Sequence, residues 1–413
     1  MAEPIKPFSI GERILELRSE RTPTMTQAHL AERAGVGVEL ISKLERGAKQ
    51  TAKLTTLHKI ARALDVDVSA LLSRPASIEP ADDQDGGVLA IRRAITTLWD
   101  EGEPASVAEL DREARYAWMA FSTNRFDVLA SQLPGFITAA RATVRAEPSP
   151  GAHAALSDAY AVTASMLTLL GHVDLGYLAM ERAIAAGDRA EDALVRAALS
   201  GRMSWLLLHQ TGGADQARRL AVEEADRFEP RLGKALPEQI AIWAGLLVCG
   251  AVAAARDGRA DEADDMLNLA EAATTRLAVA DPDRHGKPAG AIWRDRAVRN
   301  EIVHGIPQVI MQQVDVAVVT GRPARALKIA ERMPPDNGLP LISRARHMAD
   351  VAYAQTGLGR DRQATETLLS IEQQAPYWMR YQGYPKTIVR ELLERERRAN
   401  PLLRGLAARL HVA

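Results

Sequence analysis

The chain has 413 residues, of which 47% are hydrophobic but only 4% aromatic, and its formal net charge is −1 at pH 7. This length is typical of two or three domains, and an apolar fraction rich in alanine and leucine favours packed helices over sheets. The single cysteine, Cys249, excludes an intrachain disulfide. The first residues lack the basic and apolar segments of a secretory signal, and apolar runs such as Ala241–Ala255 are interrupted by glycines and are short for a bilayer. We therefore expect a soluble, cytoplasmic protein without membrane contact.

The basic residues gather near the N-terminus. Residues 1–75 carry 12 Lys/Arg against 9 Asp/Glu, whereas the remainder of the chain is acidic overall. Between Lys43 and Arg62, six basic residues accompany a single acidic residue, Glu45. Such a cluster is the electrostatic signature of phosphate binding, although a solvated charged helix face is the alternative interpretation for any one of these residues.

The N-terminal segment predicts a helix followed by a helix-turn-helix. Apolar residues at helical spacing predict a first helix over residues 10–21. The stretch TQAHLAERAGVGVELISKLERG, residues 26–47, then predicts two short helices separated by a tight turn. Thr26 suits the N-cap of the earlier helix, and Gly35 suits a left-handed residue at its end.

The two short helices also have the side chains that a close crossing requires. A small residue at Ala31 allows the crossing, and Ile41 and Leu44 are predicted to point inward. The second helix begins near Gly37. Its predicted outward residues are Val38, Glu39, Ser42 and Lys43.

Two further helices and a linker are predicted after the motif. Residues 54–64 have helical apolar spacing, and a short fifth helix follows with Leu71 and Leu72 inward. Five helices would complete a domain over residues 1–74. Residues 75–87, PASIEPADDQDGG, contain two prolines, two glycines and four acidic residues, which is typical of a linker.

This pattern resembles the helix-turn-helix of the lambda-repressor/Cro-like family, from about Ile10 to Leu72 and including the LERG at residues 44–47. The resemblance implies that the second motif helix enters the major groove of double-stranded DNA. The residues placed for base contacts are Val38, Glu39, Ser42 and Lys43. The residues placed for phosphate contacts are Gln27, Arg46, Lys49, Thr51 and Lys53. The sequence departs from the family at Gly37 and Val38, where a polar residue is usual.

Residues 88–413 predict a loose helical repeat. Several units consist of an apolar helix, a turn, and a second helix with a small residue five or six positions later. The turns are placed at Asn124, Gly171, Gly212, Gly258, Gly321 and Gly359. The small residues are Ala130, Gly176, Ala217, Ala263, Ala326 and Ala364. Turn spacings of 41, 46, 63 and 38 residues from Gly171 onward exceed the 34-residue tetratricopeptide period, so the units would be degenerate.

The repeat region resembles a tetratricopeptide-type superhelix. The whole layout is similar to actinobacterial-type regulators in which a lambda-repressor-like domain precedes such repeats. The segments that carry this resemblance are VELISKLERG, TLHKIARALDVDVSALL, RFDVLASQLPGFITAAR and VRELLERERRANPLLRGLAARL. They describe packing rather than chemistry, and they imply a sensor or interaction domain without identifying its ligand.

No catalytic residue, metal ligand or cofactor is predicted. The nine histidines show no metal-binding spacing, and no nucleophile or phosphate-loop motif occurs. Cys249 lies in an apolar run, where a packed small hydrophobe is expected. The polar stretch Ala280–Gly290 is predicted as an inter-repeat loop, with a ligand-gating loop as the alternative. The six tryptophans are expected mostly in the core, with one or two available to line a groove.

The sequence therefore predicts a sequence-specific transcriptional regulator rather than an enzyme. Its repeats would form a homodimer and sense a peptide, a small molecule or a protein partner in the repeat groove. The alternative is a protein-interaction scaffold whose helix-turn-helix does not recognise DNA specifically. An unrecognised enzyme has no positive support.

Overall fold

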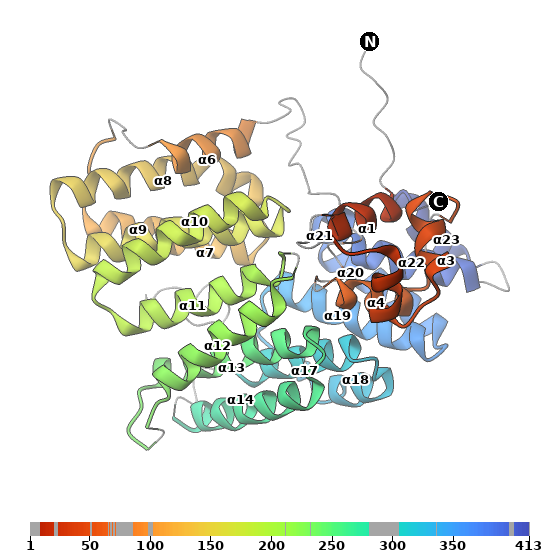
Figure 1. Cartoon of the computed structure of the whole chain (residues 1–413). Coiled ribbons are helices and arrows are strands. Elements are labelled where there is room, and N and C mark those ends of the chain that lie inside the picture. The colour runs from red at the N-terminus through yellow and green to blue at the C-terminus, as the bar shows by residue number, and fades with distance from the viewer. Residues whose placement is uncertain are drawn as a thin grey trace, which may run out of the picture.

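The computed structural model describes residues 9–19, 24–49, 52–64, 66, 68, 71, 86–97, 102–210, 212–231, 233–280, 305–335, 337–395 and 400–412. Every regular element in these residues is helical, which confirms the predicted all-α fold. Figure 1 shows a curved stack of helices, with a small N-terminal domain beside its C-terminal end.

The N-terminal domain has the predicted motif. Its described helices are α1 (Ile10–Ser19), α2 (Gln27–Ala34), α3 (Val38–Glu45) and α4 (Leu54–Ala63). Thr26 caps α2 by accepting a hydrogen bond from the amide of His29 at 3.1 Å, and Gly35 ends α2 with φ of 59°. The bounds of the predicted fifth helix lie outside the described residues, although Val68 and Leu71 are buried.

The rest of the described chain forms the helix stack. Its elements are α6 (Gly86–Thr96), α7 (Val107–Ser122), α8 (Phe126–Ala146), α9 (Pro150–Leu169), α10 (Val173–Gly187), α11 (Ala193–Leu207), α12 (Ala214–Phe228), α13 (Pro237–Arg256), α14 (Ala260–Ala280), α17 (Ile306–Val319), α18 (Pro323–Ala330), α19 (Leu341–Gly357), α20 (Asp361–Gln374), α21 (Pro376–Tyr381), α22 (Gly383–Arg395) and α23 (Pro401–Arg409). Most of the predicted linker lies outside the described residues, and α6 begins at Gly86, within the segment predicted as linker.

The stack consists of helix pairs joined by tight turns. The pairs are α7–α8, α9–α10, α11–α12, α13–α14, α17–α18 and α19–α20. Each predicted turn residue has a positive φ, from 61° at Asn124 to 83° at Gly171. This left-handed conformation reverses the chain within a few residues, so the second helix of each pair lies against the first.

The predicted small residues lie where paired helices approach each other. Ala217, Ala263, Ala326 and Ala364 are completely buried, and Ala130 is 7% exposed. At Gly176 of α10, a Cβ atom would lie only 2.7 Å from Oγ1 of Thr168 on α9. Oγ1 of Thr168 donates in turn to the carbonyl of Ala164, so it has little freedom to move. The spacing of α9 and α10 therefore depends on the missing side chain.

We predict that Gly176→Ala destabilises the protein relative to Gly135→Ala by about 1–3 kcal/mol, because the added methyl group overpacks the α9–α10 contact. Gly135 lies within α8, and a Cβ atom there would have no other atom within 4 Å, so alanine should be neutral or stabilising by up to about 1 kcal/mol. Urea denaturation followed by circular dichroism measures both free energies of unfolding. Equal effects of the two substitutions would contradict the packing argument.

Helix α13 is longer than the apolar run Ala241–Ala255 that we expected to be too short for a bilayer. The glycines do not interrupt it. By length and composition alone, its 20 residues are enough to cross a membrane, contrary to that expectation. Within the fold, however, 89% of its most apolar window is buried. Cys249 on this helix is completely buried, as predicted, and burial raises the pKa of its thiol to about 12. The apolar composition of α13 is thus that of a central core helix.

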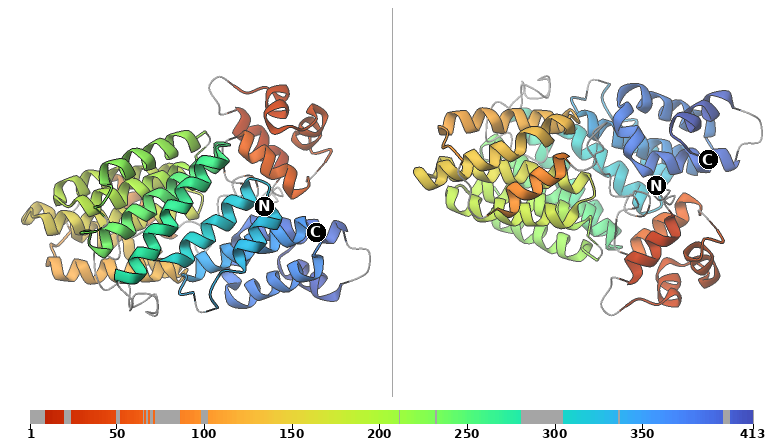
Figure 2. Two further views of the ribbon diagram at one scale, coloured as in Figure 1. Left: turned by 90° about the horizontal axis from the view of Figure 1, so that it is seen from below. Right: turned by 90° about the horizontal axis from the view of Figure 1, so that it is seen from above.

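The N-terminal domain packs beside the last repeats. One cluster of buried apolar residues extends from α6 to α17. A second contains the core of the N-terminal domain together with apolar residues of α17 to α23. Helix α4 lies against α22, and both views in Figure 2 show the N-terminal domain next to this end of the stack and away from α6 to α12.

Candidate nucleic-acid interface

A largely buried ion pair joins the three helices α1, α2 and α3. Arg18 of α1 donates to both carboxylate oxygens of Glu45 in α3, at 2.8 and 2.9 Å, and to the carbonyl of Met25 at 2.6 Å. Gln27 of α2 donates to Glu45 at 2.6 Å. The side chain of Glu45 is only 3% exposed and that of Arg18 12%. Hydrogen bonding to Glu45 raises the pKa of Arg18, and the two parallel N–H···O bonds are the strong, bidentate kind.

The backbones of α1 and α3 also approach each other closely. A Cβ atom on Gly11 would lie 1.8 Å from the carbonyl oxygen of Leu44. Only glycine fits at this crossing. The Arg18–Glu45 pair joins the same two helices seven residues farther along α1 and directly after Leu44 on α3. The orientation of α3 is therefore set by main-chain contact and by a bidentate ion pair.

The structure places the predicted base-contacting residues on one outward face of α3. Val38 is 46% exposed, Glu39 and Lys43 are exposed, and Ser42 is half-buried. The inward residues Ile41 and Leu44 are completely buried. Lys43 forms an ion pair with Glu39 at 2.8 Å, and this pairing lowers the pKa of Glu39. Both charges lie in solvent, where such a pair holds its partners only weakly.

The predicted phosphate-contacting residues lie around the two ends of the motif. Arg46, Lys49 and Lys53 are exposed, and Lys53 precedes the first turn of α4. Arg46 directs its Nε to the carbonyl of Ser42 at 3.2 Å. Thr51 lies outside the described residues. The N-terminus of α4 adds its backbone amides and helix dipole to these cations, an arrangement that favours an anion.

Gln27 has a structural contact that the sequence does not predict. Its side chain is half-buried, and its hydrogen bond to Glu45 uses one of the two amide N–H groups. A contact between Gln27 and a phosphate therefore has to come from the other N–H group. The same bond holds the start of α2 against the end of α3.

Sequence reasoning missed the roles of Arg18 and Glu45. In the sequence, Glu45 is the single acidic residue within the basic cluster. In the structure, its side chain points inward onto Arg18. The two residues are 27 positions apart, and no local periodicity links them. Because the Glu45 side chain is buried, the exposed edge of the motif is more basic than the numbers of acidic and basic residues in the sequence indicate.

Other candidate residues from the sequence form no second site in the described ranges. No group of three or more His, Cys, Asp or Glu residues there is arranged to hold a metal ion. Trp118, Trp243 and Trp378 are buried, Trp205 is 37% exposed, and Trp99 and Trp293 lie outside the described residues. Ala280 ends α14, and the remainder of the predicted loop at 280–290 also lies outside them.

Comparison with known proteins agrees with this geometry. Residues 21–71 match a family described as helix-turn-helix. The chain is 34% identical over 70 residues to the HTH-type transcriptional regulator SinR of Bacillus licheniformis and, with the same identity and length, to that of Bacillus subtilis (strain 168). Each match covers 17% of this chain and 61% of the relative. No solved structure matches the chain.

These findings confirm the predicted helix-turn-helix of the lambda-repressor-like type at the N-terminus. They concern the small domain alone. The likeness of the helix stack to tetratricopeptide repeats stays a prediction.

We predict that Glu45→Ala destabilises the N-terminal domain by about 3 kcal/mol, because Arg18 would keep a largely buried charge without its carboxylate. Glu16→Ala is the matched control, because Glu16 forms a pair with Arg13 on α1 but is 55% exposed. That control should change stability by less than about 1 kcal/mol. Hydrogen exchange of α1 and α3 amides in the whole chain measures the local change. Similar protection in the two variants would show that the Arg18–Glu45 pair does not hold these helices.

Proposed function

We propose that the protein is a sequence-specific DNA-binding transcriptional regulator, with α3 as the recognition helix. The observation that carries this proposal is the exposed outward face of α3 on a domain that matches the helix-turn-helix family. The name of both relatives, HTH-type transcriptional regulator, supports the same function. A short helix with exposed side chains at its N-terminal half is suited to enter the major groove.

The charge of the surface supports this orientation. Glu45 is paired with Arg18, and Glu39 is paired with Lys43. The remaining charge on the exposed surface around α3 and α4 is therefore positive. Arg46, Lys49 and Lys53 are exposed on this side of the motif. Contacts to phosphates would supply most of the affinity and its salt dependence, whereas Val38, Glu39, Ser42 and Lys43 would supply base preference.

Three of the four outward residues of α3 have chemically distinct base partners. Lys43 suits the acceptors of guanine, and Val38 suits the methyl group of thymine. Glu39 can accept a hydrogen bond from the amino group of cytosine. Because Lys43 and Glu39 are paired in the free protein, binding of either one to a base has to separate an exposed ion pair. Exposed pairs of this kind contribute little to stability, so the exchange of partners costs little.

The helix stack is proposed to dimerise the protein and to bind a signal, either a peptide, a small molecule or a protein partner. One small helix-turn-helix makes few base contacts, and two copies on a two-fold operator would supply specificity. The stack is also far larger than a dimer contact needs, and paired helices of this kind form long concave surfaces. A cytoplasmic location belongs to the same proposal.

The test of the proposal is a binding assay on DNA. Full-length protein is used to select binding sequences from a random duplex library, and the affinity for the selected site is compared with that for a scrambled duplex. Specific binding of about a thousandfold or more would agree with a regulator. Equal affinity for the two duplexes would instead support a protein-interaction scaffold.

We predict that Lys53→Ala weakens binding to all sequences alike and reduces the slope of log affinity against log salt by about one, because it removes one phosphate contact. Lys234→Ala, which changes an exposed lysine far along the chain in the stack, should leave the slope unchanged. Fluorescence anisotropy at several salt concentrations measures both. An unchanged slope for Lys53→Ala would place Lys53 outside the interface.

We predict that Lys43→Ala relaxes the preference at one base position by roughly 1–3 kcal/mol, because a base contact is lost. This change also leaves Glu39 without its partner, and the carboxylate would then repel DNA. Comparing the double variant Glu39→Gln, Lys43→Ala with Glu39→Gln alone isolates the contact of Lys43, because the carboxylate is absent from both. If the selected sequence is the same for the wild type and both variants, the outward face of α3 is not the base-contacting surface.

A further inference from the structure

The N-terminal domain touches the last repeats through three aromatic side chains. The ring of His58 on α4 lies 4.7 Å from that of Tyr353 on α19 and 6.1 Å from that of Tyr384 on α22, measured between centroids. The two tyrosine rings are 6.2 Å apart. We call His58, Tyr353 and Tyr384 the interdomain ring cluster. Tyr353 is 6% and Tyr384 1% exposed, so the stack presents both rings from within its own core.

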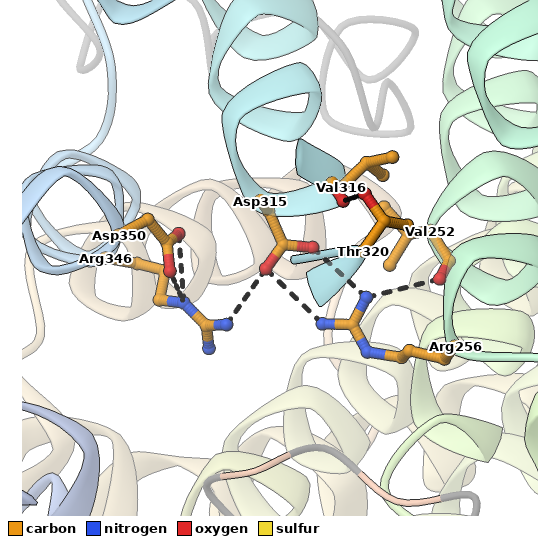
Figure 3. Close-up of polar contacts among 7 residues, drawn as sticks. All are labelled: Val252, Arg256, Asp315, Val316, Thr320, Arg346 and Asp350. Atoms are coloured by element: carbon orange, nitrogen blue, oxygen red, sulfur yellow. Dashed lines mark hydrogen bonds and ion pairs between the residues drawn. The ribbon is translucent and has the colours of Figure 1, made fainter. Parts of the chain in front are cut away.

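A row of paired charges, all buried except the half-buried Arg346, reaches the same rings from the interior of the stack. Arg256 of α13 donates to Asp315 of α17 at 3.1 Å, and Arg346 of α19 donates to Asp315 at 3.0 Å and to Asp350 at 3.3 Å. Figure 3 shows these four residues in a line, with Asp315 between the two arginines. We call them the charge chain.

The charge chain and the interdomain ring cluster are continuous. The guanidinium carbon of Arg346 lies 5.0 Å from the centroid of the Tyr384 ring, a cation–π contact. Asp350 is completely buried, and burial of Tyr384, together with the charge of Asp350, raises the pKa of Tyr384. A physical path of contacts therefore runs from α13 through α17, α19 and α22 to α4.

Buried charges in such a path have few alternative arrangements. Asp315 and Arg256 are 5% and 6% exposed, and each is held by an opposite charge. Moving Arg346 would leave the carboxylates of Asp315 and Asp350 with less compensation in a medium where charges interact strongly. The position of Arg346, and with it the face of Tyr384, is thus set by the packing of three repeat helices.

The contact with α4 leaves the DNA-binding surface uncovered. Val38, Glu39 and Lys43 remain exposed although α4 is packed on the stack. Docking through α4 therefore fixes the direction of α3 without blocking it. Among the described helices, the main contact across this boundary is that of α4 with α22, together with the three rings. Interfaces between domains of one chain are commonly small enough to open.

We propose that the interdomain ring cluster is the coupling element of the protein: it docks the N-terminal domain on the last repeats, and the charge chain sets whether it is docked. A change in the packing of α13, α17 and α19 would then be transmitted to the orientation of α3. This inference rests on the proposed function only in its consequence for DNA, because docking itself is a property of the free chain.

The docking is tested by single-molecule energy transfer on the whole chain. Dyes are attached at Glu32→Cys in α2 and Gln363→Cys in α20, both exposed positions on opposite sides of the contact. Cys249 is buried, and its raised thiol pKa of about 12 disfavours labelling. The measurement counts docked and undocked molecules without DNA, so its failure and a failure to bind DNA are separate results.

We predict that His58→Ala raises the ratio of undocked to docked molecules about tenfold, as expected for loss of an aromatic pair and its buried area. His58→Phe, which retains a ring, should stay within about threefold of the wild type. Lys59→Ala, at an exposed neighbouring position on α4, is the control and should have no effect. If His58→Ala behaves like Lys59→Ala, or if His58→Phe is as undocked as His58→Ala, the docking role of the ring cluster is overturned.

The role of the charge chain is tested by Arg346→Gln. The variant should raise the undocked ratio about tenfold, because Tyr384 loses its cation and two carboxylates lose a partner. Arg362→Gln is the control, because Arg362 pairs with Glu366 but is 92% exposed. Circular dichroism establishes that each variant is folded. If Arg346→Gln unfolds, Arg346→Lys takes its place. This variant keeps the charge and should raise the ratio of undocked to docked molecules by a smaller factor. An unchanged ratio in a folded variant at Arg346 overturns transmission through the charge chain.

Discussion

A pair of helices with one apolar face has no complete core of its own, and this constraint organises the protein. Each pair in the stack buries its face only against the preceding and the following pair. The helices approach closely because alanine or glycine occupies the crossing points, as at Gly176 and Ala217. The last pair therefore needs a cover, and α21 to α23 together with the N-terminal domain supply it. The placement of the helix-turn-helix domain follows from the packing of the repeats.

Ion pairs between helices fix the orientation in which the helices pack. An apolar interface of alanine, leucine and valine tolerates sliding, whereas an aspartate between two arginines has one good position. Asp315 joins α17 to both α13 and α19 in this way, and Arg18 with Glu45 joins α1 to α3 in the small domain. These pairs need not add much net stability. Their effect is on helix orientation, which is what the proposed insertion of α3 into a DNA groove requires.

The two kinds of charge in the small domain have different roles because of their burial. The side chain of Glu45 is 3% exposed and holds the helices together, whereas that of Glu39 is 79% exposed and pairs with its neighbour Lys43. Burial keeps the Arg18–Glu45 pair intact when salt or DNA is present. Exposure leaves Lys43 and Glu39 available for the proposed contacts with bases. A rigid support and an adaptable contact surface thus lie on opposite faces of the same short helix.

The sequence by itself determined the local geometry. Residue spacing predicted which side chains of α3 are buried, and glycine or asparagine predicted every turn of the paired helices, because helical period and a positive φ depend only on near neighbours. It did not predict that Glu45 binds Arg18, 27 residues away, or that Arg256 binds Asp315, 59 residues away. Nor did it indicate that His58 meets Tyr353 and Tyr384. Only the tertiary structure decided these contacts, because a side chain at a helical position can face any partner that packing brings within reach.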